Sequence, residues 1–354
     1  MVRLAILGLG PAWDIRYAPA VERMRRAGRI SVAGVFDSVF TRAHHAASHF
    51  ETCPASGVRS LLERTTVDAV LILERGWQDR YPINVAFELG KPTLIAGSLG
   101  EDIGLLESLC SHVKERGITA MPEFSRRYTP ATCRLNELIA TRLGPAEHLT
   151  IDAVLPTPDI HGKIPGQTTG FDFLIGLLDW CRYILRSEPV VIDTRPFGGS
   201  TQSQQQDYLV QIGFRRRQSD ARAPRAQLRI RGPATFSQSN RPAANSSVDN
   251  NPEKPATADT ENSVPQLLFE VECANGRAIL ESSCEITWTL GERTHIESLA
   301  SERSEIEVIL DQFCRRVVGG LIPAPDLSDV LRNMTIARAV ADSRTTNAPV
   351  LLEP

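Results

Sequence analysis

The sequence predicts a two-domain α/β fold, in which a Rossmann-type, doubly wound parallel sheet precedes a domain with a mostly antiparallel sheet. Three observations carry this prediction. Strand-length apolar runs alternate with helical-period segments up to about residue 122, and a glycine-rich turn follows the first run. In the second half, strands with turn signals follow one another. The predicted domains are 1–122 and 123–354.

Alternation of strands and helices defines the first domain. Units of this βαβ type form parallel sheets that helices cover on both faces, with right-handed crossovers. The expected strands are 4–7, 30–36, 67–73, 92–96 and 118–121, and the expected helices are 11–27, 41–50, 81–89 and 104–116.

The second half contains one long helical segment, 171–185, followed by strands. Ala274-Asn275-Gly276 predicts a hairpin, because Asn-Gly tolerates positive φ. Asp326 is placed to cap the last helix. Strands are expected over 207–214, 226–230, 267–273, 277–282 and 285–290, and closing helices over 305–318 and from about 326.

Composition limits the classes of function. The net charge of −3 over 354 residues gives no attraction to nucleic acid or to anionic membranes. The seven cysteines show no C-x-x-C spacing, and no metal site is expected. The N-terminus enters a strand at once and no apolar run could span a membrane, so we expect a cytoplasmic protein. Residues 233–264 are almost without apolar side chains and are expected to be a disordered insertion.

The turn after the first strand reads Gly8-Leu9-Gly10-Pro11-Ala12-Trp13. Its first glycine allows a tight turn, its second lets the backbone approach a pyrophosphate, and the helix start at Pro11 would face the phosphates. Asp37 ends the second strand, where an acid binds ribose hydroxyls and disfavours a 2′-phosphate, so NAD is predicted over NADP. Alternatively, this is a plain turn and Asp37 caps the next helix. Trp13 replaces the third glycine of the fingerprint.

The chain resembles the glucose–fructose oxidoreductase / inositol dehydrogenase / MocA (Gfo/Idh/MocA) family over nearly its whole length. The resemblance implies a Rossmann domain followed by a domain with a large open sheet. It also implies a nicotinamide-dependent sugar or polyol oxidoreductase, often a homo-oligomer through that sheet. Besides the glycine turn, the phrases that carry it are Val67-Asp68-Ala69-Val70-Leu71-Ile72, Glu88-Leu89-Gly90-Lys91-Pro92, Arg126-Arg127-Tyr128-Thr129-Pro130, Leu143-Gly144-Pro145-Ala146 and Ile336-Ala337-Arg338-Ala339.

The resemblance also implies two proton-handling residues, a lysine in Glu-Lys-Pro and a histidine in Asp-x-x-x-His-x-x-Asp. In this chain those positions are Gly97 and Gly176, whereas Asp172 and Asp179 match the two acids. Neither glycine can transfer the proton that alcohol oxidation releases. The mouth of the cleft is expected to carry charged groups instead, namely Glu74, Arg75, Asp79, Arg126, Arg127 and Asp172.

Three hypotheses follow. In the leading one, the chain binds NAD(H) and a sugar-like molecule but lacks standard sugar or polyol dehydrogenase activity. The alternative is an active NAD-dependent oxidoreductase whose acid–base group is Asp172, Glu74, His161 or Lys163. The third is a non-catalytic interaction protein without nucleotide, which Trp13 favours.

The candidate site residues follow from these hypotheses. Asp172 is the candidate catalytic residue, and it joins Arg127 and Asp179 as a candidate substrate ligand. Cofactor binding is assigned to Gly8, Gly10, Pro11, Ala12, Asp37 and Glu74.

Overall fold

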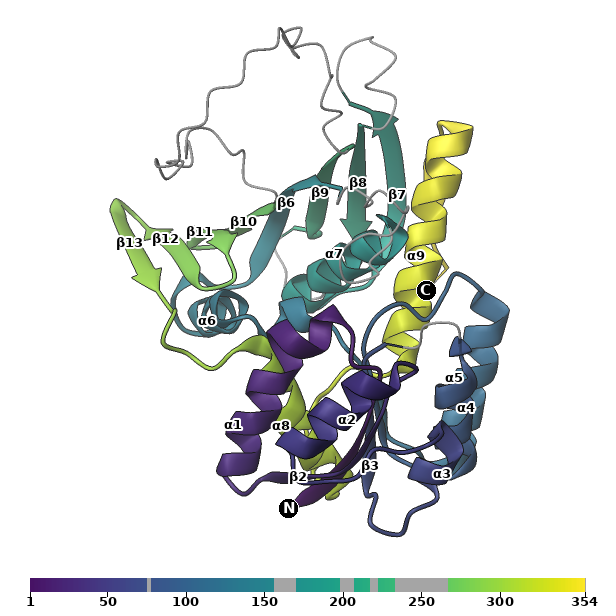
Figure 1. The fold of residues 1–354 in the computed structure, drawn as a ribbon. Coiled ribbons are helices and arrows are strands. Elements are labelled where there is room, and N and C mark those ends of the chain that lie inside the picture. The colour runs from purple at the N-terminus through teal and green to yellow at the C-terminus, as the bar shows by residue number, and fades with distance from the viewer. Residues whose placement is uncertain (75–77, 156–169, 198–206, 217–221, 233–266, 354) are drawn as a thin grey trace, which may run out of the picture.

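The computed structural model describes residues 1–74, 78–155, 170–197, 207–216, 222–232 and 267–353. Two sheets organise them (Figure 1): a five-stranded sheet of order β2-β1-β3-β4-β5 and a nine-stranded sheet of order β13-β12-β11-β10-β6-β9-β8-β7-β14. The predicted fold class is confirmed. The predicted insertion 233–264 lies outside the described residues.

All neighbouring strands of the first sheet run parallel. β2 and β3 lie on opposite sides of β1, so the direction in which the chain moves across the sheet reverses at β1. In such sheets ligands bind at this reversal point. The strands are β1 (Val2–Leu7), β2 (Ile30–Phe36), β3 (Ala69–Ile72), β4 (Thr93–Ile95) and β5 (Ala120–Pro122).

Helices cover both faces of this sheet (Figure 1). On one face lie α1 (Ala18–Arg26), α2 (Phe40–His49) and α8 (Glu305–Val317), and on the other lie α3 (Val58–Leu62), α4 (Tyr81–Glu88) and α5 (Ile103–Arg116).

Helix α8 comes from the part of the chain assigned to the second domain. Its Ile306, Ile309 and Phe313 are nevertheless buried in one cluster with Leu4 and Ile6 of β1. The helical period predicts this element but cannot show which sheet it covers. The domain division at residue 122 stays a prediction. The structure adds that α8, from the second half of the chain, packs on the first sheet.

Trp13 explains why the first helix differs from the single helix predicted over 11–27. A five-residue π-helix, η1 (Trp13–Tyr17), precedes α1. The Trp13 indole is buried and meets the Phe50 ring edge-on, with 5.7 Å between the ring centroids. A widened first turn therefore coincides with the bulky side chain that stands in place of the third glycine.

The second sheet is antiparallel except for the parallel pair β6–β9. The hairpin at Ala274-Asn275 is confirmed, but neither Asn275 nor Gly276 adopts positive φ, so the reason given for it is wrong. The strands are β6 (Ala146–Val154), β7 (Pro189–Pro196), β8 (Tyr208–Phe214), β9 (Arg225–Arg231), β10 (Leu267–Cys273), β11 (Gly276–Ser282), β12 (Glu285–Leu290), β13 (Arg293–Ser298) and β14 (Val350–Leu351).

Helices α6 (Pro130–Leu138), α7 (Gly170–Leu185) and α9 (Leu327–Thr346) lie along the second sheet. The predicted cap is confirmed, since the Asp326 carboxylate accepts hydrogen bonds from the backbone N–H groups of Ser328 and Asp329. Two short helical turns, η3 (Ser125–Tyr128) and η4 (Ile139–Leu143), flank α6.

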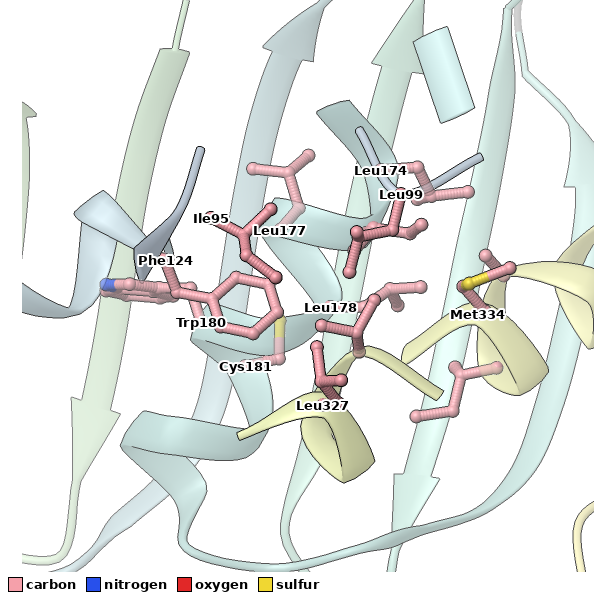
Figure 2. Close-up of a cluster of buried hydrophobic side chains, with 14 of the residues drawn as sticks. Ile95, Leu99, Phe124, Leu174, Leu177, Leu178, Trp180, Cys181, Leu327 and Met334 are labelled. Carbon is pink, nitrogen blue, oxygen red and sulfur yellow. The ribbon is translucent and has the colours of Figure 1, made fainter. Parts of the chain in front are cut away.

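An apolar junction joins the two halves (Figure 2). Side chains that follow β4 and β5 pack against α7 and the start of α9, and all of them belong to one buried cluster. The labelled members are Ile95, Leu99, Phe124, Leu174, Leu177, Leu178, Trp180, Cys181, Leu327 and Met334. This junction fixes α7 against the carboxyl edge of the first sheet.

We expect Trp13→Ala to lower the free energy of unfolding by about 3–5 kcal/mol, because it leaves a cavity beside Phe50. Ile15→Ala is the control, since Ile15 lies in the same π-helix but is 78% exposed. It should change stability by no more than about 0.5 kcal/mol. Denaturant unfolding measures both. A loss at Trp13 no larger than that at Ile15 would show that the indole does not support the turn.

Candidate functional site

A cleft of about 450 Å³ lies between the carboxyl edge of the first sheet and helices α7 and α9. This volume falls within the range of small-molecule sites. Its lining is Pro11, Ala12, Ile15, Arg16, Leu73, Ala96, Gly97, Ser98, Leu99, Gly100, Pro122, Glu123, Phe124, Ser125, Arg126, Asp172, Ile175, Gly176, Asp179, Val330 and Met334.

The two glycines at the expected proton-handling positions both line this cleft. Gly97 has φ of +76°, and a β-carbon there would touch nothing within 4 Å. A β-carbon at Gly176 would lie 3.5 Å from Nη1 of Arg126. Open space therefore surrounds position 97, and the guanidinium of Arg126 lies beside position 176.

Asp179 is tied to Arg127 by a bidentate ion pair. Nε and Nη2 of Arg127 donate to the two Asp179 oxygens at 2.8 and 2.5 Å. Asn333 of α9 donates a third hydrogen bond to Asp179 at 3.0 Å, and Arg182 donates to Asn333 at 2.9 Å. These contacts join η3, α7 and α9 beneath the cleft.

Charge compensation explains the burial of this pair. Burial raises the pKa of the Asp179 carboxyl, and the hydrogen bonds from Arg127 act in the opposite direction. Burial also works against the charge of Arg127, but the attraction of Asp179 outweighs it and raises the pKa of Arg127. The two hydrogen bonds between Arg127 and Asp179 are of the charge-assisted, bidentate kind, which is the stronger kind. The predicted substrate residues Arg127 and Asp179 are thus engaged with each other.

Glu123 is a cleft residue that the sequence analysis did not select. It accepts hydrogen bonds from Arg16 at 2.8 Å and from the Tyr17 hydroxyl at 2.6 Å. Burial, together with the negative charge of Glu123, raises the pKa of Tyr17 well above its usual value. Only the position of Glu123 directly after β5 could have indicated a site, because polar residues at strand ends often line clefts.

Arg126 differs from its neighbour Arg127. Its Nε is buried and has no hydrogen-bond partner among the described residues, and its guanidinium lies 5.1 Å from the centre of the Phe173 ring. Burial lowers the pKa of Arg126 to about 10, and the nearby charge of Arg16 acts in the same direction. The charge of Asp179 acts in the opposite direction, but Arg126 makes no ion pair with it and borders the cleft with its Nε unbonded among the described residues.

The glycine turn has the backbone of a nucleotide cradle. Gly8 has φ of +82°, and a β-carbon on it would overlap the backbone of Glu74, so the turn and β3 approach closely. A β-carbon on Gly10 would overlap Oε2 of Glu74. The carboxylate of Glu74 thus lies across the place where a pyrophosphate approaches the turn.

Asp37 closes the same region. One of its oxygens accepts a hydrogen bond from the Leu9 backbone N–H at 2.6 Å, and the other accepts one from Val39 at 2.7 Å. The Val39 contact spans only two residues, and α2 has Val39 itself as its N-cap without a side-chain cap hydrogen bond, so Asp37 is not the helix cap that the alternative expected. The Leu9 contact ties the end of β2 to the glycine turn. A small cavity of about 40 Å³ is lined by Leu7, Gly8, Phe36, Asp37, Ser38, Arg42, Glu74, Gln78 and Pro82.

The predicted site residues therefore fall into two neighbouring groups. Gly8, Asp37 and Glu74 border the small cavity, with Gly10 against Glu74. Pro11, Ala12, Asp172 and Asp179 line the large cleft. Arg127 is not part of this lining but is bonded to Asp179. His161, Lys163 and Arg75 lie outside the described residues.

Neither a metal cluster nor a membrane span is found in the described part of the chain. It holds no group of three or more His, Cys, Asp or Glu side chains placed to bind a metal ion. None of its helices is both long and apolar enough to cross a membrane.

No family model matches the sequence, and no curated protein matches it. Solved structures do. A putative myo-inositol dehydrogenase from Sinorhizobium meliloti superposes with a TM-score of 0.71 at 17% identity, covering 100% of both chains. Aldose-aldose oxidoreductase from Caulobacter crescentus gives 0.74 at 14% identity, covering 99% of both chains.

A super-repressor mutant of Gal80p from Saccharomyces cerevisiae gives a TM-score of 0.74 at 12% identity, covering 99% of this chain and 97% of that one. The fold is thus shared with proteins named for oxidoreduction and with one named for repression. The predicted resemblance to Gfo/Idh/MocA proteins is confirmed at the level of the two-domain fold.

We expect Asp179→Asn to lower the free energy of unfolding by about 3 kcal/mol, because the buried charge of Arg127 then keeps only its longer ion pair with Asp329, at 3.5 Å. Glu63→Gln is the control, since it removes one carboxylate from an exposed pair with Arg59. That change should cost less than about 1 kcal/mol. Equal losses in the two variants, measured by denaturant unfolding, would contradict the structural role of the buried pair.

Proposed function

We propose that the chain is a member of the Gfo/Idh/MocA family that binds a nicotinamide dinucleotide, NAD in preference to NADP, and a sugar-like molecule in the cleft. We also propose that it lacks standard sugar or polyol dehydrogenase activity. The observation that carries this proposal is that Gly97 and Gly176 both line the cleft, whose described lining contains neither lysine nor histidine.

The backbone of the cradle fits a dinucleotide, which would supply the site with a hydride donor or acceptor. Gly8 makes the tight turn, and the N-terminus of the first helix at Pro11 and Ala12 faces the phosphate position. Asp37 at the end of β2 is the acid that favours a free ribose hydroxyl, and hence NAD. The carboxylate of Glu74 lies beside Gly10, so binding of the pyrophosphate there would require that side chain to move.

The proposed loss of activity is supported by the engagement of Asp179 and Glu123, two of the three acids in the described lining of the cleft. Alcohol oxidation needs a base within hydrogen-bond reach of the hydroxyl. Asp179 is held by Arg127 and Asn333, and Glu123 is held by Arg16 and Tyr17. Arginine stays protonated near neutral pH and cannot serve as the base.

An NADH titration of the purified full chain, followed by cofactor fluorescence, tests this function. We expect wild type to bind, Gly10→Arg to lose binding, and Gly104→Arg, at an exposed helical glycine of α5, to retain it. With NAD and a panel of sugars and polyols, turnover should stay far below the usual enzyme range of roughly 1–10³ per second. Turnover within that range would overturn the loss of activity.

Asp172 supports the alternative of an active oxidoreductase, because its position on α7 lets it line the cleft. If Asp172 is a relocated base, turnover with NAD is measurable and Asp172→Asn abolishes it while NADH binding persists. Under our proposal, the wild-type chain already has no measurable turnover, so Asp172→Asn changes nothing.

Glu74 supports the third function, a non-catalytic interaction protein without nucleotide, because its carboxylate lies across the cradle. Failure of wild type to bind NADH, together with failure of every Glu74 variant, would favour this function over ours.

We expect Glu74→Ala to tighten NADH binding by about tenfold, equivalent to about 1.4 kcal/mol. The substitution removes both the overlap at Gly10 and the repulsion between the carboxylate and the pyrophosphate. Glu115→Ala is the control, because Glu115 is exposed on α5 and its loss changes the net charge equally. If the two variants bind NADH with equal affinity, Glu74 does not compete with the cofactor.

We further propose a homo-oligomer in the cytoplasm that associates through the second sheet and takes no part in nucleic-acid or membrane binding. Burial alternates along β8 and β9, so one side of this sheet packs on the core while the other is partly exposed. Light scattering on the purified chain measures the oligomeric state, and a monomer at micromolar concentration would contradict it.

A further inference from the structure

We propose that the cleft selects ligands that carry a single carboxylate, such as six-carbon sugar acids, and that Arg126 binds this carboxylate. The inference rests on the proposed function only in that the cleft is taken as the site of a sugar-like ligand. A guanidinium can donate two parallel hydrogen bonds to one carboxylate, which gives both strength and orientation.

The position of Arg126 is the first argument. It follows β5 in the turn η3, lines the cleft, and directs Nη1 toward the space left by the missing side chain at Gly176. Phe173 packs near the guanidinium. The Nε of Arg126 is buried without a hydrogen-bond partner among the described residues. Buried donors of this kind cost free energy unless a ligand satisfies them.

The balance of charge around the cleft is the second argument. Arg16 is paired with Glu123 at 2.8 Å and with Glu305 at 3.4 Å. Asp179 is paired with Arg127. Of the two arginines in the described lining, Arg126 is therefore the one without an ion pair among the described residues, and its guanidinium is available to an anionic group of a ligand.

This balance favours a carboxylate over a phosphate. A phosphate monoester carries a charge of about −1.5 to −2 at neutral pH, more than one guanidinium offsets. Asp172, Asp179 and Glu123 also line the cleft and would repel the excess negative charge. A carboxylate brings only one negative charge, so these acids repel it less than they repel a phosphate.

The remaining lining suits a polyhydroxylated body. Ser98 and Ser125 offer hydroxyl groups, and the open space at Gly97 leaves room where a lysine side chain would otherwise lie. The cleft volume of about 450 Å³ is sufficient for a small ring or chain with several hydroxyls.

Calorimetric titration of the full chain in the presence of NADH tests the inference. Three acids are compared with their neutral counterparts: D-gluconate with D-glucitol, D-glucuronate with D-glucose, and D-galacturonate with D-galactose. We expect at least one acid to bind about tenfold tighter than its counterpart, because hydrogen bonds to charged groups are the stronger ones. Arg126→Gln should abolish this preference. Arg277→Gln, which removes an equal charge from the exposed surface of β11, should leave it unchanged.

The possible results separate this inference from the proposed function. No preference for any acid in wild type, or an equal preference in Arg126→Gln, overturns the carboxylate site even when NADH binds. Tighter binding of D-glucose 6-phosphate than of all three acids overturns the argument from charge. Failure to bind NADH refutes the proposed cofactor. The same acids and neutral sugars are then titrated into the chain without NADH, and that comparison decides the carboxylate site. If Arg126→Gln does not fold, the comparison in wild type and in Arg126→Lys, which keeps the charge without the planar fork, decides the matter.

Discussion

The buried ion pair between Arg127 and Asp179 is the constraint on which the arrangement of the cleft depends. It lies beside the apolar junction of Figure 2, where either charge alone would be costly. Each partner therefore needs the other, and Asn333 brings α9 to the same carboxylate. Three segments far apart in the sequence are held together in this way, and the cleft opens above them.

The doublet Arg126-Arg127 shows how one constraint produces two roles. Arg127 turns toward α7 and is satisfied by Asp179, so its contribution is structural. Arg126 lines the cleft, and its Nε has no hydrogen-bond partner among the described residues. The ion pair with Arg127 removes Asp179 from proton transfer.

Much of the fold could be predicted from the sequence, because the strands of the first sheet are largely buried, and β3, β4 and β5 entirely so, which makes them short apolar runs. The residues that could not be predicted depend on distant partners. Nothing local to α8 indicates that Ile306 packs with Leu4. Similarly, the sequence placed Arg126 and Arg127 together at the cleft mouth, but only the fold shows which of them Asp179 engages. Glu74 was identified as a site residue. That its carboxylate lies against Gly10 could not be predicted, because this contact depends on the packing of β3 beside the turn.

The glycine turn does not depend on a nucleotide for its own stability. A turn that presents backbone N–H groups to a phosphate would leave them unsatisfied when the ligand is absent. Here Asp37 accepts the N–H of Leu9, and the carboxylate of Glu74 lies against Gly10 at the positive end of the first helix. Asp37 thus satisfies one such donor from within the chain. Under the proposed function, a dinucleotide would compete with the Glu74 carboxylate for the space beside Gly10, so its affinity would report this competition as well as the fit of the turn.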